Sequence, residues 1–170
     1  MVMNPMPHFL CDEMLGRLCL YLRAAGYDTL LANNGRSDAE LLRQCGEEGR
    51  YFLTQDQLVR EHKAAQGVAL ILPQGNLDQL AALLGEHYEL DWLSHAFTRC
   101  LVDNTLLVAA DEAARSRAPL DALRPDELLN HCPGCGRVYW RGSHYKRMRA
   151  KLSAWQEAKT NPSAHSATEV

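Results

Sequence analysis

The stretch that decides the fold is HFLCDEMLGRLCLYLRAAGYDTLLA, which spans residues 8–32. Its apolar start, 8–12, ends in an acid and predicts a buried strand. A second apolar run, 28–32, predicts a second strand. Between them, Gly26 ends a segment with apolar side chains at helical spacing, namely Met14, Leu15, Leu18, Tyr21 and Leu22. The stretch therefore predicts a strand–helix–strand unit.

The same alternation continues to about residue 90. Ser37 followed three residues later by Glu40 is the capping-box pattern that opens a helix. Strands that are apolar almost throughout are typical of parallel sheets covered on both faces. We therefore predict a three-layer α/β fold with a central, mostly parallel sheet. Its further elements are predicted at 37–49 (helix), 50–54 (strand), 56–66 (helix), 68–73 (strand) and 76–88 (helix).

The pattern changes after about residue 96, where we expect a small appended module. Its predicted elements are a strand, a turn and a strand at 97–111, short helical pieces at 112–131, a knuckle and a strand at 132–140, and a basic helix at 143–159. We therefore divide the chain into a first domain at 8–95, a second module at 96–152, and a tail at 160–170 that we expect to be disordered.

Length and composition limit the class of protein. A chain of 170 residues, 46% of them hydrophobic, can bury the core of one domain, with or without a small appendage. No run approaches the roughly 18 consecutive apolar residues of a membrane helix. The amino-terminal residues also lack the pattern of a signal peptide. We therefore expect no membrane span, and a cytoplasmic location is the default.

Three aspartates fall at or near the ends of successive predicted strands. Asp12 ends the first strand, Asp38 opens the helix after the second, and Asp56 follows the third. Helix capping explains each one alone, but three at the carboxyl edge of one parallel sheet favour a shared cation. Mg²⁺ or Mn²⁺ commonly binds clustered carboxylates, and it can activate a water for attack on a phosphate. The sequence has no glycine-rich phosphate loop and no G-x-S-x-G motif.

The motif CPGCG, at 132–136, predicts a metal knuckle built on Cys132 and Cys135. The expected partner knuckle starts at Cys100, and its second ligand position is Asp103. Three interpretations stay open: Asp103 completes a structural Zn²⁺ site, a histidine such as His131 or His144 or a water replaces it, or no zinc is bound. The single cysteines predict buried side chains, at Cys11, Cys19 and Cys45.

The segment after the knuckle is basic and aromatic, in a chain of net charge −3. Tyr139 and Trp140 can stack on unpaired bases, but inward packing is at least as good an interpretation. The basic residues predict contact with phosphates, and the alternative is a solvated amphipathic helix. The candidate phosphate-binding residues are Arg141, His144, Lys146, Arg147, Arg149 and Lys151.

Several of these pieces together resemble the Mut-seven C-terminal RNase-domain family over roughly residues 8–150. They are FLCDEMLGRLCLYLRAAGYDT, SDAELL, GRYFLTQD, FTRC and CPGCGRVYWRGSH, in that order. The resemblance implies a PIN-like nuclease fold with an appended zinc ribbon. It also implies a metal-dependent ribonuclease whose acidic site uses Asp12, Asp38 and Asp56, with Thr54 supporting the third acid.

Two positions depart from the pattern of that family. Asp103 stands where the family usually has a zinc-binding cysteine, and Leu58 stands where another acid often follows the third one. We interpret the chain as a nuclease that cleaves RNA phosphodiester bonds with Mg²⁺ or Mn²⁺. The rival interpretations are a non-catalytic RNA-binding or assembly factor on the same scaffold and a protein-interaction module. The three acids favour the enzyme, and the two departures keep the rivals open.

Overall fold

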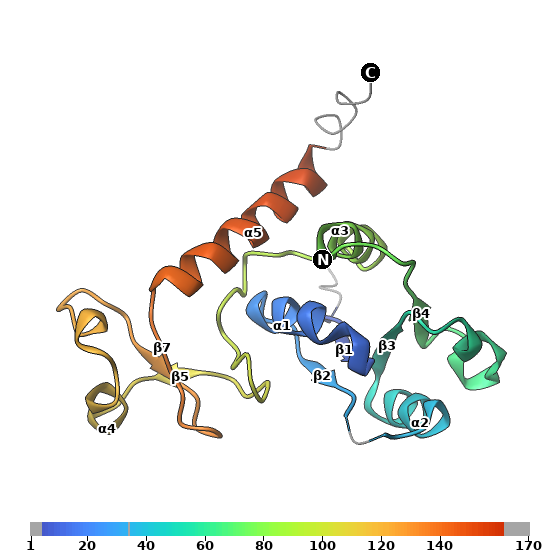
Figure 1. The fold of residues 1–170 in the computed structure, drawn as a ribbon, viewed down its shortest axis with the longest axis horizontal. Coiled ribbons are helices and arrows are strands. Elements are labelled where there is room, and N and C mark those ends of the chain that lie inside the picture. Colours follow the sequence, from blue (N-terminus) through green and yellow to red (C-terminus); the bar gives the residue numbers. More distant parts are fainter. Residues whose placement is uncertain (1–4, 34, 162–170) are drawn as a thin grey trace. The chain divides into compact units, whose positions relative to one another are not determined.

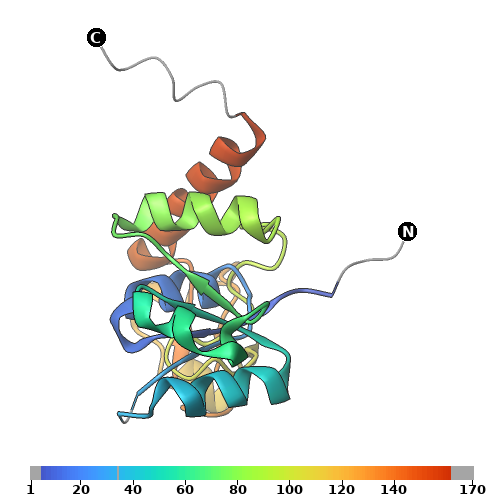
Figure 2. The same cartoon turned by 90° about the vertical axis from the view of Figure 1, so that its right-hand side faces the viewer.

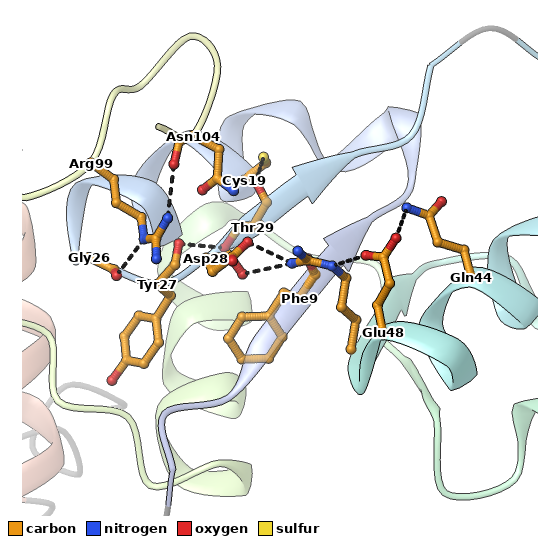
Figure 3. Close-up of polar contacts among 11 residues, drawn as sticks. Phe9, Cys19, Gly26, Tyr27, Asp28, Thr29, Gln44, Glu48, Arg99 and Asn104 are labelled. Carbon is orange, nitrogen blue, oxygen red and sulfur yellow. Dashed lines mark hydrogen bonds and ion pairs between the residues drawn. The ribbon is translucent and has the colours of Figure 1, made fainter. Parts of the chain in front are cut away.

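A computed structural model of the chain describes residues 5–33 and 35–161. The chain divides into two compact units. Of the described residues, the first unit holds those up to Leu22 and those in Tyr27–Leu90, and the second holds Arg23–Gly26 and those from Asp91 onward. Hydrogen bonds connect the short segment to the rest of the second unit; in one of them, Arg99 donates to the Gly26 carbonyl (Figure 3).

A four-stranded parallel sheet forms the centre of the first unit (Figure 1). Its strands are β1 (His8–Cys11), β2 (Thr29–Leu31), β3 (Arg50–Thr54) and β4 (Ala69–Ile71). They are ordered β2-β1-β3-β4, so Leu10 of β1 pairs with Leu30 on one side and Phe52 on the other. The two inner strands are the most buried ones, since the last three residues of β1 and of β3 are each at most 1% exposed, as a sheet covered on both faces requires. The predicted parallel sheet is confirmed.

Helices cover this sheet on both faces (Figures 1 and 2). A 3₁₀ turn, η1 (Glu13–Leu15), leads into α1 (Gly16–Ala24), while α2 (Asp38–Glu48) follows β2 and α3 (Leu77–His87) follows β4. Both views place α2 and α3 on opposite sides of the sheet. On the α2 side, the core is built mainly from Leu10, Leu41, Leu42, Phe52 and Val59, each at most 3% exposed. The fold is therefore the three-layer α/β arrangement that the sequence predicts.

Local signals set the two ends of α2. Ser37 and Glu40 form the predicted capping box, in which the Ser37 N–H donates to Glu40 Oε2 at 2.9 Å. Gly49 ends the helix with φ 66°, a left-handed conformation that glycine adopts at little cost. Arg50 then opens β3 and forms an ion pair with Asp28, 2.6 Å away, just before β2. This pair ties two strands at the amino edge, opposite the predicted acids.

The connection between β3 and β4 differs from its prediction. Instead of one helix over 56–66, the chain forms two 3₁₀ segments, η2 (Gln57–Glu61) and η3 (Lys63–Ala65). His62 separates them with an extended backbone. The buried side chains here are Val59 and Ala65, six positions apart, so no apolar face repeats every three or four residues to hold a continuous helix. The predicted single helix is wrong.

The second unit contains a small antiparallel sheet in the order β5-β6-β7. Its strands are β5 (Val108–Ala109), β6 (Asn130–His131) and β7 (Val138–Tyr139). Of the strand pair predicted at 97–111, the second part contains β5, whereas the first contributes only an isolated bridge between Arg99 and Leu106. The predicted helical pieces are α4 (Glu112–Ser116) and the 3₁₀ segment η4 (Leu120–Ala122).

The predicted basic helix is α5 (Ser143–Thr160). Its buried side chains are Met148, Leu152 and Trp155. The Trp155 ring packs edge-on against Trp92, with ring centroids 4.9 Å apart. Since α5 runs to Thr160, the first residue of the expected tail is helical; residues 162–170 lie outside the described part of the chain. None of the helices described is both long and apolar enough to span a membrane.

Candidate functional site

The three predicted acids lie along the carboxyl edge of the parallel sheet. Asp12 directly follows β1, Asp56 lies two residues after β3, and Asp38 is the first residue of α2, which follows β2. In the order β2-β1-β3-β4, the chain reverses its direction of winding between β1 and β3. Ligands of open parallel sheets bind at such a switch point. Asp12 and Asp56 follow the two strands that form it.

Thr54, the last residue of β3, connects these two acids. Its side chain is fully buried. The Thr54 hydroxyl donates a hydrogen bond to Asp12 Oδ2 at 2.7 Å and accepts one from the backbone N–H of Asp56 at 3.0 Å. Thr54 therefore contacts the main chain of the third acid and the carboxylate of the first. The bond fixes the orientation of the Asp12 carboxylate.

The capping interpretation holds for two of the acids but does not use all their oxygens. Asp12 Oδ1 accepts from the N–H of Glu13 at 2.7 Å, at the start of η1. Asp56 Oδ1 accepts from the N–H of Leu58 at 2.8 Å, at the start of η2. Each cap leaves lone pairs on the carboxylate, since an ionised carboxyl group has about four acceptor sites. Capping and cation binding are therefore compatible here.

Asp38 is not the cap of its own helix. Ser37 takes that position, so the half-buried Asp38 carboxylate lies in the first turn of α2, near the positive end of the helix dipole. Within the described residues, no ion pair involves Asp12, Asp38 or Asp56. Carboxylates at one edge without a basic partner repel one another, and a divalent cation relieves that repulsion.

The three acids do not form a closed set of ligands. Among the residues described, one group of three or more His, Cys, Asp or Glu side chains brings all its ligand atoms within 4.8 Å of one another, and that group lies elsewhere. The acid edge is instead open, and Leu58 beside it is 63% exposed. Open geometry suits Mg²⁺ or Mn²⁺, because such ions keep several water ligands and need few carboxylates.

The closed group is the predicted metal cluster of the second unit. It consists of Cys100, Asp103, Cys132 and Cys135. The Cys100 and Cys135 sulfurs are 3.6 Å apart, and the Cys132 sulfur is 3.3 Å from both carboxylate oxygens of Asp103. A tetrahedral zinc with Zn–S bonds of about 2.3 Å places two sulfurs roughly 3.8 Å apart. The four side chains therefore fit one metal ion such as zinc.

The two knuckles have the same backbone hydrogen bonds. In the first, the Asn104 N–H donates to the Cys100 carbonyl at 3.0 Å, and Asn104 has φ 70°. In the second, the Gly136 N–H donates to the Cys132 carbonyl at 2.9 Å, and Gly136 has φ 76°. Asp103 therefore occupies the position in its turn that Cys135 occupies in the other. This equivalence favours Asp103 as the fourth ligand.

Neighbouring groups fix the Asp103 carboxylate in place. Its Oδ1 accepts from the N–H of Thr105 at 3.0 Å, and this bond, with others to neighbouring side chains, holds the pKa of Asp103 well below its usual range. A β-carbon added at Gly134 would lie 2.7 Å from Asp103 Oδ2. The glycine of CPGC thus leaves room for a carboxylate at the ligand position. The alternative ligands His131 and His144 are not members of the group.

The three thiols of the cluster can all be thiolates at once only when a cation offsets their negative charges. The backbone N–H of Arg137 lowers the pKa of the Cys135 thiol, but burial and the adjacent thiols of Cys100 and Cys132 outweigh it and raise that pKa to about 11. A bound divalent metal reverses this effect, since thiolate is the form that coordinates.

Sequence reasoning missed two residues that hold the cluster. The Tyr139 hydroxyl lies 3.1 Å from the Cys100 sulfur and accepts from the Leu101 N–H at 3.0 Å, so its proton is available to the sulfur. Arg23, only 8% exposed, donates to the carbonyls of Leu101 and Val102, each at 3.0 Å. Such contacts around metal ligands orient them. The one feature of the sequence that could have indicated these contacts is the position of Tyr139, four residues after Cys135.

The six candidate phosphate-binding residues, called the basic strip from here on, lie along α5 and in the turn before it. Four of its candidates on α5 are exposed, namely His144, Lys146, Arg147 and Arg149. Lys151 is half-buried, and its ammonium group lies 5.8 Å from the centre of the Trp155 ring. Arg141 is exposed, and its backbone N–H donates to Glu127 Oε1 at 2.8 Å. The strip therefore contains exposed charge, but Lys151 also packs on its own helix.

The structure combines a parallel α/β unit that has acids at its switch point with a Cys₃Asp cluster on two matched knuckles, which is the arrangement of a small α/β protein with a zinc-ribbon-like module. The Mut7-C RNAse domain family matches residues 7–152, and the chain belongs to that family. No curated protein matches the sequence. Family membership indicates a nuclease or RNA-related role.

Proposed function

We propose that the protein is a metal-dependent ribonuclease that cleaves RNA phosphodiester bonds at the carboxyl edge of its parallel sheet. The observation that carries this proposal is the buried hydroxyl of Thr54, which orients the Asp12 carboxylate and is bonded to the main chain of Asp56. Membership in an RNase-domain family supports the same conclusion.

The residues of the edge have separate tasks in this proposal. Asp12 and Asp56 hold a Mg²⁺ or Mn²⁺ ion from the two strands of the switch point, and Asp38 approaches from the amino end of α2. Thr54 keeps Asp12 from rotating. When bound, the ion lowers the pKa of a coordinated water and offsets the charge of the phosphate. The exposed side of the edge, at Asp56 and Leu58, leaves room for a nucleic-acid chain.

The Cys₃Asp cluster has a structural task. Three buried or crowded thiols and one carboxylate leave no open position on a four-coordinate ion, which is typical of structural zinc rather than catalytic zinc. The zinc would join the loop after Arg99 to the β6–β7 hairpin, and the basic strip begins directly after that hairpin. His144, Lys146, Arg147 and Arg149 would then contact the RNA backbone.

Replacing the acids one at a time tests this function. Asp12→Asn, Asp38→Asn and Asp56→Asn keep the size and most hydrogen bonds of each side chain but lower its charge. We expect each change to reduce the rate of Mg²⁺- or Mn²⁺-dependent cleavage of single-stranded RNA. For Asp12→Asn and Asp56→Asn the reduction should be at least about 100-fold, because direct ligands of a catalytic ion are replaced. Glu47→Gln, an exposed change on α2, serves as the control and should cleave normally.

A non-catalytic RNA-binding factor is the second candidate function. It is favoured by the exposed Leu58 at the position of an expected acid. If purified, zinc-loaded protein binds RNA but shows no cleavage in Mg²⁺ or Mn²⁺, and Asp56→Asn binds equally well, this second function replaces the first.

A further inference from the structure

The second unit contains a cavity that the chemistry of the acid edge does not use. Its volume is about 700 Å³, within the range of roughly 300–1,000 Å³ that is typical of small-molecule sites. Leu101 and Val102 of the first knuckle, Tyr139 of β7 and the first turn of α5 contribute to its walls. Because the Tyr139 hydroxyl bonds to Cys100 and Leu101, the metal cluster holds these walls together.

Aromatic rings line much of the cavity. Phe97 and Tyr145 pack against each other with ring centroids 4.3 Å apart and planes tilted by 45°. Phe97 has φ 61°, a left-handed conformation that is rare for a bulky residue, and its N–H bonds to the Ala24 carbonyl at 2.6 Å. Both side chains are only half-buried, so the pair still presents ring surface. Such surface binds an unpaired base by stacking.

The charged residues of the lining all have one sign. They are Arg99, Arg137 and Arg141; His144 adds an imidazole, and the lining contains no Asp or Glu. Arg99 is committed to backbone carbonyls, at Gly26 and Asn104 (Figure 3). No ion pair is formed by Arg137, Arg141 or His144 with any residue in the described parts of the chain. The cavity is therefore suited to an anionic ligand that also has an aromatic ring.

Asn130 adds a group that can recognise a base edge. It lies on β6 and lines the cavity. Its amide group offers both hydrogen-bond donors and an acceptor, as the edges of nucleobases do. Aromatic surface, cationic side chains and one amide are the combination that binds a nucleotide.

We propose that this cavity binds one unpaired nucleotide of single-stranded RNA. The base stacks on the Phe97–Tyr145 pair, and its phosphate lies among Arg137, Arg141 and His144. The choice of RNA over another anionic aromatic ligand rests on the proposed ribonuclease function. A duplex is excluded from the cavity, because a paired and stacked base cannot enter it.

Binding of labelled RNA to the full-length, zinc-loaded chain tests the proposal. Fluorescence anisotropy, without added Mg²⁺ or Mn²⁺, measures the affinity for a single strand of about ten nucleotides and for the matching duplex. We expect Tyr145→Leu to weaken single-strand binding by at least about fivefold, the low end of one lost base stack. Duplex binding should be unchanged. Tyr145→Phe keeps the ring and should bind like wild type.

Zinc content and circular dichroism show whether Tyr145→Leu is folded. If it is not, a second pair of variants tests the same proposal. Arg141→Gln changes an exposed side chain of the cavity, and Arg124→Gln makes the same change on an exposed arginine that does not line it. We expect weaker single-strand binding and a salt dependence shallower by about 0.7 log unit only in Arg141→Gln. Competition by free nucleoside monophosphate would show that the base and phosphate suffice without a longer chain.

The result that overturns the proposal is wild-type single-strand affinity in folded Tyr145→Leu, or equal affinities in Arg141→Gln and Arg124→Gln. This failure is distinct from failure of the ribonuclease function. If the cavity is misassigned but the protein is a nuclease, the cavity variants bind normally and Asp56→Asn does not cleave. If the nuclease function is misassigned but the cavity is right, Asp56→Asn behaves like wild type and the cavity variants lose binding.

Discussion

At the scale of single residues, Thr54 is the most informative position of the acid edge. A threonine at the end of a buried strand usually needs only one hydrogen bond to satisfy its hydroxyl. Here the hydroxyl donates to a carboxylate of the neighbouring strand and accepts from the chain two residues on. Hydrogen bonds to charged groups contribute about 1.5–3 kcal/mol. Thr54 therefore both stabilises the edge and orients Asp12.

Thr54→Val removes this hydroxyl while keeping the shape of the side chain. We expect RNA cleavage to fall by about 10- to 100-fold, the usual cost of losing a contact that orients a metal ligand. Thr54→Ser retains the hydroxyl and should keep most of the rate. Rates measured at saturating Mn²⁺, alongside melting temperatures, separate an effect on chemistry from an effect on folding. Equal rates in the valine and serine variants would remove Thr54 from the site.

Asp103 is the second informative position, because it supplies the one carboxylate of the Cys₃Asp cluster. It stands at a cysteine position of a matched pair of knuckles, and Gly134 leaves space for its carboxylate. Carboxylate is a minority ligand in structural zinc sites. The knuckle therefore tolerates the substitution because backbone geometry, rather than the ligand atom, sets the position.

Asp103→Cys should tighten zinc binding, because thiolate suits zinc better than carboxylate and the turn already has the required shape. Asp103→Ala should lose most of the zinc. Competition with a coloured chelator measures both affinities, and Asp126→Ala, an exposed aspartate in the same unit, is the control. Zinc that stays bound to Asp103→Ala with wild-type affinity would show that Asp103 is not a ligand.

At the scale of elements, patterns that act locally were predictable. Apolar runs identified the four strands, the Ser37–Glu40 pair identified the start of α2, and CPGC identified a knuckle. The prediction of one helix over 56–66 was wrong because Val59 and Ala65 are the buried side chains of its two 3₁₀ segments, and two such residues do not form an apolar helix face. The contact of Tyr139 with Cys100 joins residues 39 positions apart. A contact between residues so far apart in the chain cannot be predicted from local patterns in a single sequence.

The strip on α5 provides the prediction that belongs to this scale. Changing Lys146, Arg147 and Arg149 to Gln should weaken binding to unrelated single-stranded RNAs alike. The slope of log affinity against log salt should fall by about 0.7 for each lost phosphate contact. Lys151 is left in place, because it packs near Trp155.

The matched control for the strip changes three exposed basic residues elsewhere, at Arg43, Lys63 and Arg124. It alters net charge by the same amount, so a purely global charge effect would weaken binding equally. An unchanged salt slope in the strip variant would mean that this face of α5 is simply solvated.

At the scale of the whole molecule, the chemistry is divided between two compact units. The acids and Thr54 belong to the parallel sheet, while the metal cluster, the strip and the cavity belong to the second unit. The charge follows the same division, with net −6 over residues 1–22 and 27–90 and +3 over residues 23–26 and 91–170. An acidic unit alone repels a polyanion, so we expect the second unit to supply most of the affinity for RNA.

The central claim is that the carboxyl edge of the sheet binds a catalytic divalent ion. Anomalous X-ray scattering from crystals of the zinc-loaded protein soaked in Mn²⁺ tests it most directly, because it separates manganese from zinc. We predict a manganese peak within about 2.2 Å of a carboxylate oxygen of Asp12 or Asp56, and a zinc peak among Cys100, Asp103, Cys132 and Cys135. Manganese found only at the cysteine cluster, or nowhere along the edge at saturating concentration, would contradict the account.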